Sequence, residues 1–340
     1  MTQQLKRMFS LKDLIMIVIG TVIGSGIFIV PALVLRETEG SVGLAMLVWT
    51  VAGVLSFLGA LTYAELGAMA PEAGGLYVYV RDAFGPLPAF LYGWTLFTVM
   101  ATGSVATLAV AFASYLNQLL PLPPAVQKMV ALAVILLVTA INMLSTRKSA
   151  GVQNWTTGIK VGAIILMSVV LLALGNGFAQ TDGTFWPKSF GLDLLSGIGI
   201  AMVSVLWAYE GWQYVTYSAG EALDPQRTFA RSIAIGTAAL IAIYLIANVA
   251  YLAALGPMQA AQSERIAAQA VGTIAGPAAG KLIAVAILIS MFSAANAVVL
   301  TSSRVYFAMA RDGVFFKRFA DIHPRYGTPA AAIAWSAVCA

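Results

Sequence analysis

Two charged side chains stand inside long apolar segments of this sequence, where a charge needs a reason. Lys160 lies in TGIKVGA, 12 residues after Lys148, and Glu210 lies in WAYEGWQYV, where Tyr209 precedes Glu221 by 12 residues. With a rise of about 1.5 Å per helical residue, both sites lie roughly 18 Å from the charged end of their segment. At that depth in a membrane, an ionisable residue is a candidate for a functional site.

A third interruption lies at the same depth. The stretch GTVIGSGIF, residues 20–28, places three glycines and a serine in the first apolar segment, with Gly24 12 residues after Lys12. These residues favour a broken helix, and unwound backbone is tolerated in a membrane only inside protein or beside a water-filled cavity. The three features therefore indicate one site near the middle of the membrane.

Each feature also has a purely structural interpretation. Glycines in a membrane helix often allow two helices to pack closely, which would explain residues 20–28 without any ligand. Lys160 and Glu210 would then be partners in a buried ion pair, since charges inside a helix bundle usually pair with one another.

A broken helix offers both halves of a zwitterion a partner. The N-terminus of a half-helix carries partial positive charge, so the amides of Ser25, Gly26 and Ile27 are predicted to meet a carboxylate. Unwound carbonyls suit an ammonium group, and residues 208–209, or the backbone near Ile23, would provide them. The predicted substrate-binding set is Ile23, Gly24, Ser25, Gly26, Ile27, Trp207, Ala208, Tyr209 and Glu210.

The composition indicates an integral membrane protein. Of 340 residues, 60% are hydrophobic and 10% are charged, whereas soluble domains carry about 25% charged residues. About 20 apolar residues cross a bilayer as a helix. Long stretches without charge recur along the chain, and its apolar segments predict eight spans. Their approximate bounds are 13–36, 41–66, 86–119, 125–145, 150–176, 193–220, 230–256 and 280–309.

A ninth apolar segment begins at Pro329 and has only 12 residues before the sequence stops at Ala340. This length is too short to cross a bilayer, so we expect a fragment of a longer protein. The first apolar segment is too long for a signal peptide.

The positive charges predict the orientation. With the N-terminus inside, twelve Lys or Arg residues fall in inside loops and five in outside loops, as the positive-inside rule requires. The net charge of +5 is thereby explained without a nucleic-acid partner. We expect a multi-pass protein of the cell membrane with a cytoplasmic N-terminus.

The two breaks also predict an internal symmetry. They occupy corresponding positions, spans 1 and 6, if the repeat has five helices, and such paired breaks mark transporter sites. Span 1 starts inside and span 6 starts outside, so the repeat would be inverted. We expect one transmembrane domain over 1–340, with a first repeat at about 13–176 and the start of a second at about 193–340.

At this point the sequence resembles the amino acid–polyamine–organocation superfamily of permeases, and especially its L-type amino acid transporter-like and bacterial exchanger branch. The motifs follow the family's order across nearly the whole chain. They are GTVIGSGIF at 20–28, YAELGAMAPEAGGLYVYVRDAFG at 63–85, TGIKVGA around Lys160, WAYEGWQYV at 207–215, GEALDPQRTFARS at 220–232 and HPRYGTP at 323–329.

The resemblance implies an all-helical LeuT-like fold of five plus five inverted helices, usually with twelve spans, and alternating access to a central amino acid site. The chain would lack the end of span 9 and spans 10–12. It also implies that Lys160 stands where sodium-coupled relatives bind sodium, with its ammonium on carbonyls of residues 20–23 and on the hydroxyls of Ser290 or Ser293. Transport would then be independent of sodium.

The sequence departs from this family in two places. Eukaryotic L-type members carry a cysteine between spans 3 and 4 for a heavy-chain partner, but NQLLPLPPAVQK has none, and Cys339 is the single cysteine. We therefore expect no disulfide-linked heavy chain. Glu210 stands where several relatives have a small or apolar residue, and it would set substrate preference, exchange protons or act structurally.

Two further groups have open roles. Trp207 and Tyr209 would form a gate or pocket wall, or simply pack within the bundle. Glu65, Glu221 and Arg81 lie near the inside face. They would form the ion pairs of an inner gate, or each would simply be solvated in a loop, and we expect solvation for each of them.

The leading functional hypothesis is a sodium-independent amino acid permease, working as an exchanger or a proton symporter. The alternatives are a membrane sensor that binds an amino acid without moving it, and a channel, which would favour symmetric rings of polar residues. We expect no enzyme activity, because no nucleophile–base set is visible. We also expect no cofactor and no metal site, and no phosphate-binding loop indicates ATP drive.

Overall fold

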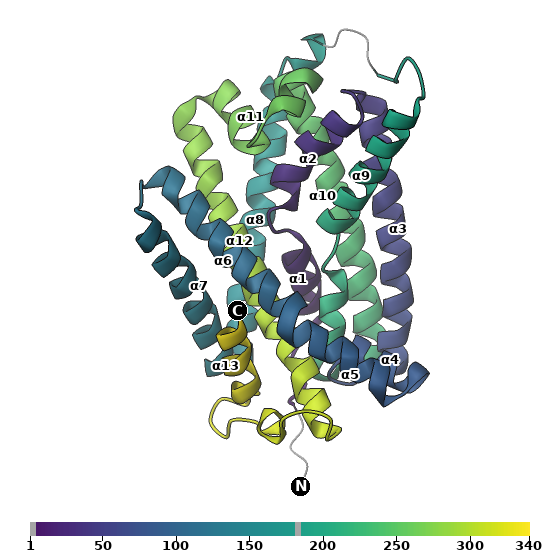
Figure 1. Ribbon diagram of the computed structural model, residues 1–340, viewed down its shortest axis with the longest axis vertical. Coiled ribbons are helices and arrows are strands. Elements are labelled where there is room, and N and C mark those ends of the chain that lie inside the picture. The colour runs from purple at the N-terminus through teal and green to yellow at the C-terminus, as the bar shows by residue number, and fades with distance from the viewer. Residues whose placement is uncertain (1–4, 181–184) are drawn as a thin grey trace.

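A computed structural model describes residues 5–180 and 185–340 of the chain (Figure 1). The described part is nearly all helix, apart from one isolated bridge between Phe9 and Ala222. The helices run side by side along the long axis of the molecule, with the N-terminus at the lower end in Figure 1. We call this end the N-terminal end and the opposite one the far end.

The predicted eight spans are confirmed, counting the broken first span as one. Their apolar composition identified the helices because a charge inside lipid is costly and therefore rare. The bounds lie within a few residues of the prediction. After the first span, they are α3 Val42–Met69, α5 to α6 Pro86–Leu119, α7 Pro124–Leu144, α8 Thr146–Leu174, α9 to η3 Leu192–Glu221, α10 Pro225–Gln262 and α12 Pro277–Arg311.

The first span is broken as predicted. Helices α1, Leu11–Val22, and α2, Gly26–Glu37, meet at a bend of 46°. At the start of α1, the Ser10 side chain accepts from the amide of Asp13, while the Asp13 carboxylate accepts from the amide of Ser10. This capping box fixes where α1 begins.

The sixth span changes helix type at its middle. Helix α9, Leu192–Ala208, ends before a short turn, and the 3-10 helix η3, Trp212–Glu221, continues to the N-terminal end. Between them Gly211 has a φ of +124°, a conformation that glycine adopts without the steric penalty of a side chain.

Four irregular features escaped the prediction. Helix α4, Leu76–Phe84, precedes span 3, and a π-helical turn, η1 Leu96–Met100, separates α5, Pro86–Thr95, from α6, Ala101–Leu119. Helix α11, Ile266–Ala275, lies at the far end, and Gly256 kinks α10.

The ninth segment forms α13, Ala330–Cys339. The short 3-10 helices η2, Gly177–Gln180, and η4, Lys317–Ala320, lie in connections.

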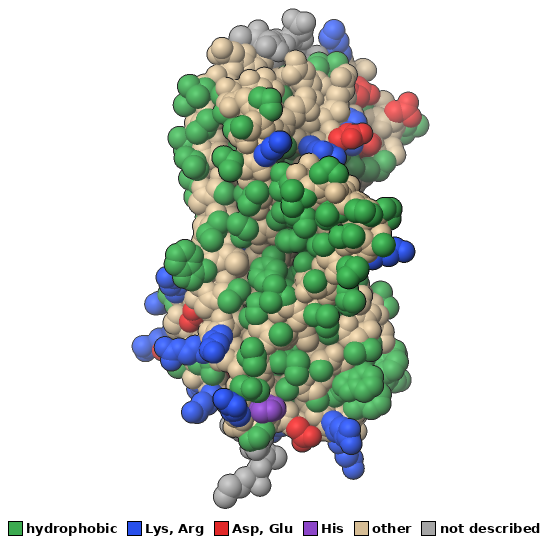
Figure 2. Space-filling view, turned by 90° about the vertical axis from the view of Figure 1, so that its left-hand side faces the viewer, with side chains coloured by type: hydrophobic (Ala, Val, Ile, Leu, Met, Phe, Trp, Pro, Cys, Tyr) green, Lys and Arg blue, Asp and Glu red, His purple; other side chains and the backbone are tan. Residues whose placement is uncertain are grey.

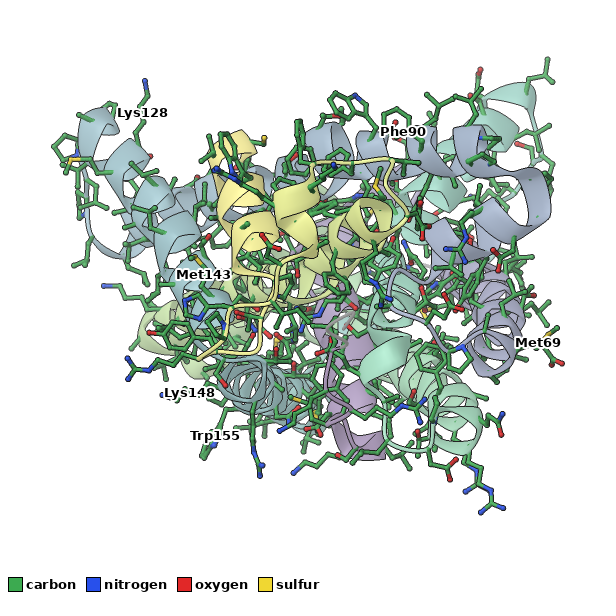
Figure 3. All side chains as sticks on the ribbon, turned by 90° about the horizontal axis from the view of Figure 1, so that it is seen from below. Met69, Phe90, Lys128, Met143, Lys148 and Trp155 are labelled. Atoms are coloured by element: carbon green, nitrogen blue, oxygen red, sulfur yellow. The ribbon has the colours of Figure 1, made fainter. Side chains whose placement is uncertain are left out.

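The surface is divided as a membrane protein requires. On the face seen in Figure 2, hydrophobic side chains cover the middle, and most charged side chains gather toward the two ends. Trp155 of α8 is 76% exposed and points away from the bundle in the view from below (Figure 3). Among the seven continuous spans, α10 and α12 are the most buried, and they form part of the interior that positions the site.

Candidate functional site

A cavity of about 370 Å³ lies where the two broken spans face α6 and α12. This volume is within the range of small-molecule sites. The cavity contains both breaks, so the features that the sequence placed at one depth also meet laterally. Of the predicted binding set, six residues line it: Gly24, Ser25, Gly26, Trp207, Ala208 and Glu210.

The two breaks are in direct contact. A Cβ placed on Gly26 would lie 3.0 Å from the Cβ of Ala208, and one placed on Gly211 would lie 3.0 Å from the carbonyl oxygen of Thr21. Real Cβ atoms rarely approach so closely. The missing side chains of these two glycines therefore allow the backbone of span 1 to lie against that of span 6.

The start of α2 presents unused donors. The Phe28 amide donates to the Ser25 carbonyl, 3.0 Å away, but the amides of Ser25, Gly26 and Ile27 make no hydrogen bond within the described residues. The first amides of a helix have no partner inside that helix and carry the positive end of its dipole. These three amides therefore remain available to donate hydrogen bonds to an anion.

The ends of α1 and α9 present unused acceptors in the same cavity. The carbonyls of Thr21 and Ala208 accept no hydrogen bond within the described part of the chain. By contrast, the Ile23 carbonyl already accepts from Lys160 at 2.6 Å and from Ser290 at 3.1 Å. A carbonyl has two lone pairs, so in this conformation the Ile23 oxygen has its full complement of donors, and of these two residues of span 1 it is Thr21 whose carbonyl is unused.

Lys160 is tied to the break rather than to a carboxylate. Its side chain is 1% exposed, and the ammonium donates to the carbonyls of Gly20 at 2.8 Å and Ile23 at 2.6 Å. Ser290 donates to the carbonyls of Ile23 and Gly24, at 3.1 and 3.0 Å. The last carbonyls of α1 thus find donors on α8 and α12, which holds the break open.

Ser293 belongs to a neighbouring polar network, not to the Lys160 group. Its hydroxyl lies 3.0 Å from that of Thr156 and 3.2 Å from the side-chain nitrogen of Gln153. Gln153 in turn accepts from Asn296 at 2.9 Å. Buried polar groups of α8 and α12 satisfy one another here, so this network ties the two helices together.

Glu210 faces the cavity without a cation. Its carboxylate accepts a hydrogen bond from Gln213, and the Gln213 oxygen accepts from the Gly211 amide at 3.0 Å. The structural reading of a Lys160–Glu210 ion pair is therefore wrong, because the two side chains have separate partners. Among the described residues that line the cavity, Glu210 is the one Asp, Glu, Lys, Arg or His.

Three predicted binding residues point away from the cavity. The Tyr209 ring is fully buried and packs against Trp49 and Tyr244, with ring centroids 5.6 and 5.2 Å away. The side chains of Ile23 and Ile27 are buried in the core. Packing is therefore the role of the Tyr209 ring, while Trp207, which is 57% exposed, lies at the edge of the cavity.

Buried tyrosines separate the cavity from the N-terminal end. Tyr214 lines the cavity, its ring lies 5.2 Å from that of Tyr217, and the hydroxyl of Tyr217 shares a hydrogen bond with that of Tyr92. Both tyrosines of η3 are buried. In this conformation η3 therefore places buried rings between the cavity and the N-terminal end.

Below the tyrosines, Glu221 is part of a buried ion pair. Its carboxylate receives two hydrogen bonds from Arg304, at 2.6 and 3.1 Å. The expectation that Glu221 is solvated is wrong: its side chain is 1% exposed. Arg81 is also paired, 2.7 Å from Asp312, whereas Glu65 is exposed and makes no ion pair within the described residues.

The N-terminal segment is fastened to the same place. The amides of Met8 and Phe9 both donate to the Glu221 carbonyl, at 2.7 and 2.9 Å, and the Leu223 amide donates to the Phe9 carbonyl at 2.9 Å. Phe9 is 1% exposed. Glu221 therefore holds the N-terminal segment through its backbone and α12 through its side chain.

The sequence reasoning missed several residues that shape the site. Arg304 stands inside span 8 and follows the rule that singled out Lys160, so its charge was a usable signal. Thr21, Ser104 and Tyr214 line the cavity, but nothing in their types marks them out in a membrane helix. No cluster of three or more His, Cys, Asp or Glu suited to a metal occurs in residues 5–180 and 185–340.

The chain is similar to known proteins along most of its length. The amino acid permease family profile matches residues 9–340. The mouse b(0,+)-type amino acid transporter 1 is 36% identical over 100% of this chain and 70% of its own length, and the human protein is 34% identical with the same coverage. The rat large neutral amino acids transporter small subunit 2 is 35% identical over 97% of the chain and 62% of its own length.

Proposed function

This chain belongs to the amino acid permease family, and we propose that it exchanges amino acids across the membrane, without sodium, by alternating access to the central cavity. Family membership makes it a multi-pass membrane transport protein and not an enzyme. The resemblance inferred from the motifs is thereby confirmed.

One observation carries the proposal: the residues that line the cavity include unused backbone donors, at Ser25 and Gly26, and unused backbone acceptors, at Thr21 and Ala208. The amides of residues 25–27 match a carboxylate, and the carbonyls of Thr21 and Ala208 match an ammonium group. An α-amino acid carries both groups one carbon apart. Such a ligand satisfies backbone groups that otherwise remain unpaired in a low-dielectric site, where an unmade hydrogen bond is costly.

Lys160 supports independence from sodium. Its ammonium supplies a fixed positive charge to the carbonyls of Gly20 and Ile23. A cation bound there would have to displace it, and two positive charges at one buried site repel strongly. We infer that Lys160, with Ser290, keeps the break of span 1 assembled throughout the cycle; Ser293 acts through the neighbouring network.

Glu210 supports a preference for side chains with positive charge. Its carboxylate lines the cavity and has a neutral partner, Gln213. A cationic substrate side chain would complete a charge-assisted hydrogen bond that a neutral one cannot make. We therefore propose that Glu210 sets the substrate preference of this chain.

Charge distribution supports the orientation. The N-terminal end carries the larger set of Lys and Arg residues predicted for inside loops, so we place this end in the cytoplasm of a cell with the protein in its plasma membrane. We retain the two inverted repeats, about 13–176 and 193–340, as a proposal supported by the meeting of the two breaks in one cavity.

No disulfide-linked heavy chain is part of the proposal. One relative is named a small subunit, which describes that protein. In this chain the connection from α6 to α7 contains no cysteine, so we propose that it transports without a covalent partner. The lipid bilayer is its surrounding, and an amino acid is its ligand.

Counterflow in proteoliposomes tests the proposal. Vesicles that hold the protein are loaded with each of the twenty amino acids in turn, and uptake of the same labelled amino acid is followed with sodium or with choline outside. Exchange predicts saturable uptake that needs internal amino acid and is equal in the two salts. Binding without counterflow would favour a sensor instead, and flux that does not saturate would favour a channel.

A further inference from the structure

A second cavity, of about 750 Å³, opens at the N-terminal end. Four parts of the chain line it: the N-terminal segment at residues 5–7, the connection at residues 71–73 with α4, the end of η3 at Gly220, and the end of α12. Tyrosines of η3 separate it from the central cavity. It is therefore a distinct compartment, and the transport proposal assigns it no ligand.

The charges that line this cavity are unbalanced. Its cations are Lys6, Arg7, Arg81 and Arg311, and its acids are Glu72 and Asp312, which leaves a net charge of +2 on the lining. The positive-inside rule predicts only that cations are common in inside loops. In this cavity the N-terminal segment, α4 and α12 bring four of them together on one wall.

The carboxylates nearby are already used by a single cation. Arg81 lies 2.7 Å from Asp312, 2.9 Å from Asp82 and 3.6 Å from Glu72. Asp312 also accepts from the Tyr77 hydroxyl at 2.9 Å, and burial together with this hydrogen bond raises the pKa of Tyr77. Tyr77 thus stays a neutral donor, and Asp312 has two donors of its own.

The other three cations of this cavity are not paired with a carboxylate of the described residues. Lys6, Arg7 and Arg311 make no ion pair within the part of the chain that the structure describes. Arg311 lies over the Phe307 ring, with its guanidinium carbon 5.8 Å from the ring centre, which leaves the guanidinium donors available. Arginine donors match the oxygens of a phosphate in a two-point contact.

We propose that this cavity binds a phosphate-bearing anion, and that the anion fastens the N-terminal segment to the end of α12. Lys6 and Arg7 directly precede Met8 and Phe9, whose amides are held by the Glu221 carbonyl. The backbone bonds join the N-terminal segment to η3, and an anion shared with Arg311 would join the same segment directly to α12, so it stabilises the closed state of the N-terminal end.

The headgroup of an anionic lipid and free phosphate share this chemistry. In the proposed orientation the cavity opens to the cytoplasmic side, where anionic lipids attract clustered Lys and Arg residues, and basic pockets between helices hold their headgroups. Each such cation contributes about a fivefold change in affinity. Removal of three cations should weaken binding on the order of a hundredfold, through the same per-cation contribution.

The test compares three proteins in nanodiscs. The cavity variant carries Lys6→Gln, Arg7→Gln and Arg311→Gln. The control variant carries Arg147→Gln, Lys148→Gln and Lys317→Gln, which remove the same charge from exposed positions that do not line the cavity. Lys148 lies on the opposite side of the bundle from Met69, the residue before the connection (Figure 3). The readouts are the thermal unfolding midpoint and the lipids retained in native mass spectrometry.

Each protein is measured in phosphatidylcholine, in phosphatidylcholine with phosphatidylglycerol, and in phosphatidylcholine with inorganic phosphate. The proposal expects phosphatidylglycerol to raise the midpoint of the wild type and the control, and expects more than half of that rise to be lost in the cavity variant. The same rise with inorganic phosphate would identify a soluble anion as the ligand.

An equal rise in all three proteins would overturn the proposal, since it would reflect the general charge of the N-terminal end. No rise in the wild type with either additive would also overturn it. If the triple variant does not fold, the single variants Lys6→Gln and Arg7→Gln at exposed positions decide the same comparison through retained lipid.

Discussion

Arg304 and Glu221 form a two-point ion pair inside the protein, although 83 residues separate them in the chain. Each side chain is 1% exposed. Arg304 also donates to the Thr146 hydroxyl at 3.2 Å, and the Glu221 carbonyl receives the amides of Met8 and Phe9. One pair thereby joins η3, α12, α8 and the N-terminal segment at the end of the bundle that the tyrosines close.

Replacement of one partner should destabilise the protein far more than replacement of both. Arg304→Met leaves the Glu221 carboxylate buried without its cation, which costs about 3–5 kcal/mol, while an apolar pair of similar volume is often near neutral. We expect Glu221→Leu added to Arg304→Met to recover most of the loss. Denaturant unfolding in detergent measures this, and equal losses in the single and double variants would contradict it.

Gly26→Ala should abolish transport while the protein remains folded. The added Cβ would lie 3.0 Å from the Cβ and 3.1 Å from the Cα of Ala208, so the two breaks would have to separate at the cavity. Gly199→Ala in α9 is the control, because nothing lies within 4 Å of the added atom. Normal counterflow by the Gly26 variant would show that the contact of the breaks is dispensable.

Lys160→Gln should reduce counterflow by at least tenfold. The amide is shorter and neutral, so the carbonyls of Gly20 and Ile23 lose a charged donor, and each buried group left unpaired costs about 1–3 kcal/mol. Lys148→Gln at an exposed position is the matched control. Unchanged counterflow in the Lys160 variant, or sodium-dependent uptake by the wild type, would refute the role assigned to this lysine.

Glu210→Gln should change substrate preference rather than abolish transport. A hydrogen bond to a charged group contributes about 1.5–3 kcal/mol, so the uptake of lysine relative to leucine should fall about tenfold to a hundredfold. Competition counterflow with both amino acids measures the ratio, and Glu65→Gln is the exposed control. A ratio that does not move would leave Glu210 without a role in selection.

Much of the architecture could be predicted from the sequence because a charge in lipid is costly, so each span appears as a long apolar segment with few charges. The break in span 1 followed from Gly24 and Gly26, and the carbonyl partners of Lys160 were expected through the resemblance to permeases. The irregular elements α4, α11 and η1 were not predicted, since they depend on packing at the ends of spans rather than on their composition.

The side chains of the site were harder to predict. Tyr209 lies in the sequence between Ala208 and Glu210, which both line the cavity. The turn after α9 nevertheless directs its ring toward Trp49 and Tyr244. Glu221 resembles a loop residue because its partner, Arg304, is distant in sequence. Pairing across the bundle is a tertiary property, and neither spacing nor residue type within one segment specifies it.

The positive charge of Lys160 is covalently attached to the protein, and this has a consequence for the energy source of transport. A diffusible ion crosses the membrane with its substrate and delivers the energy of its gradient, whereas an ammonium on a side chain returns with the protein in every cycle. The net charge moved by an exchange is then the difference between the two amino acids alone. A cationic amino acid traded for a neutral one moves one charge, worth about 2.3 kcal/mol per 100 mV of membrane potential, so voltage itself would set the direction of that trade.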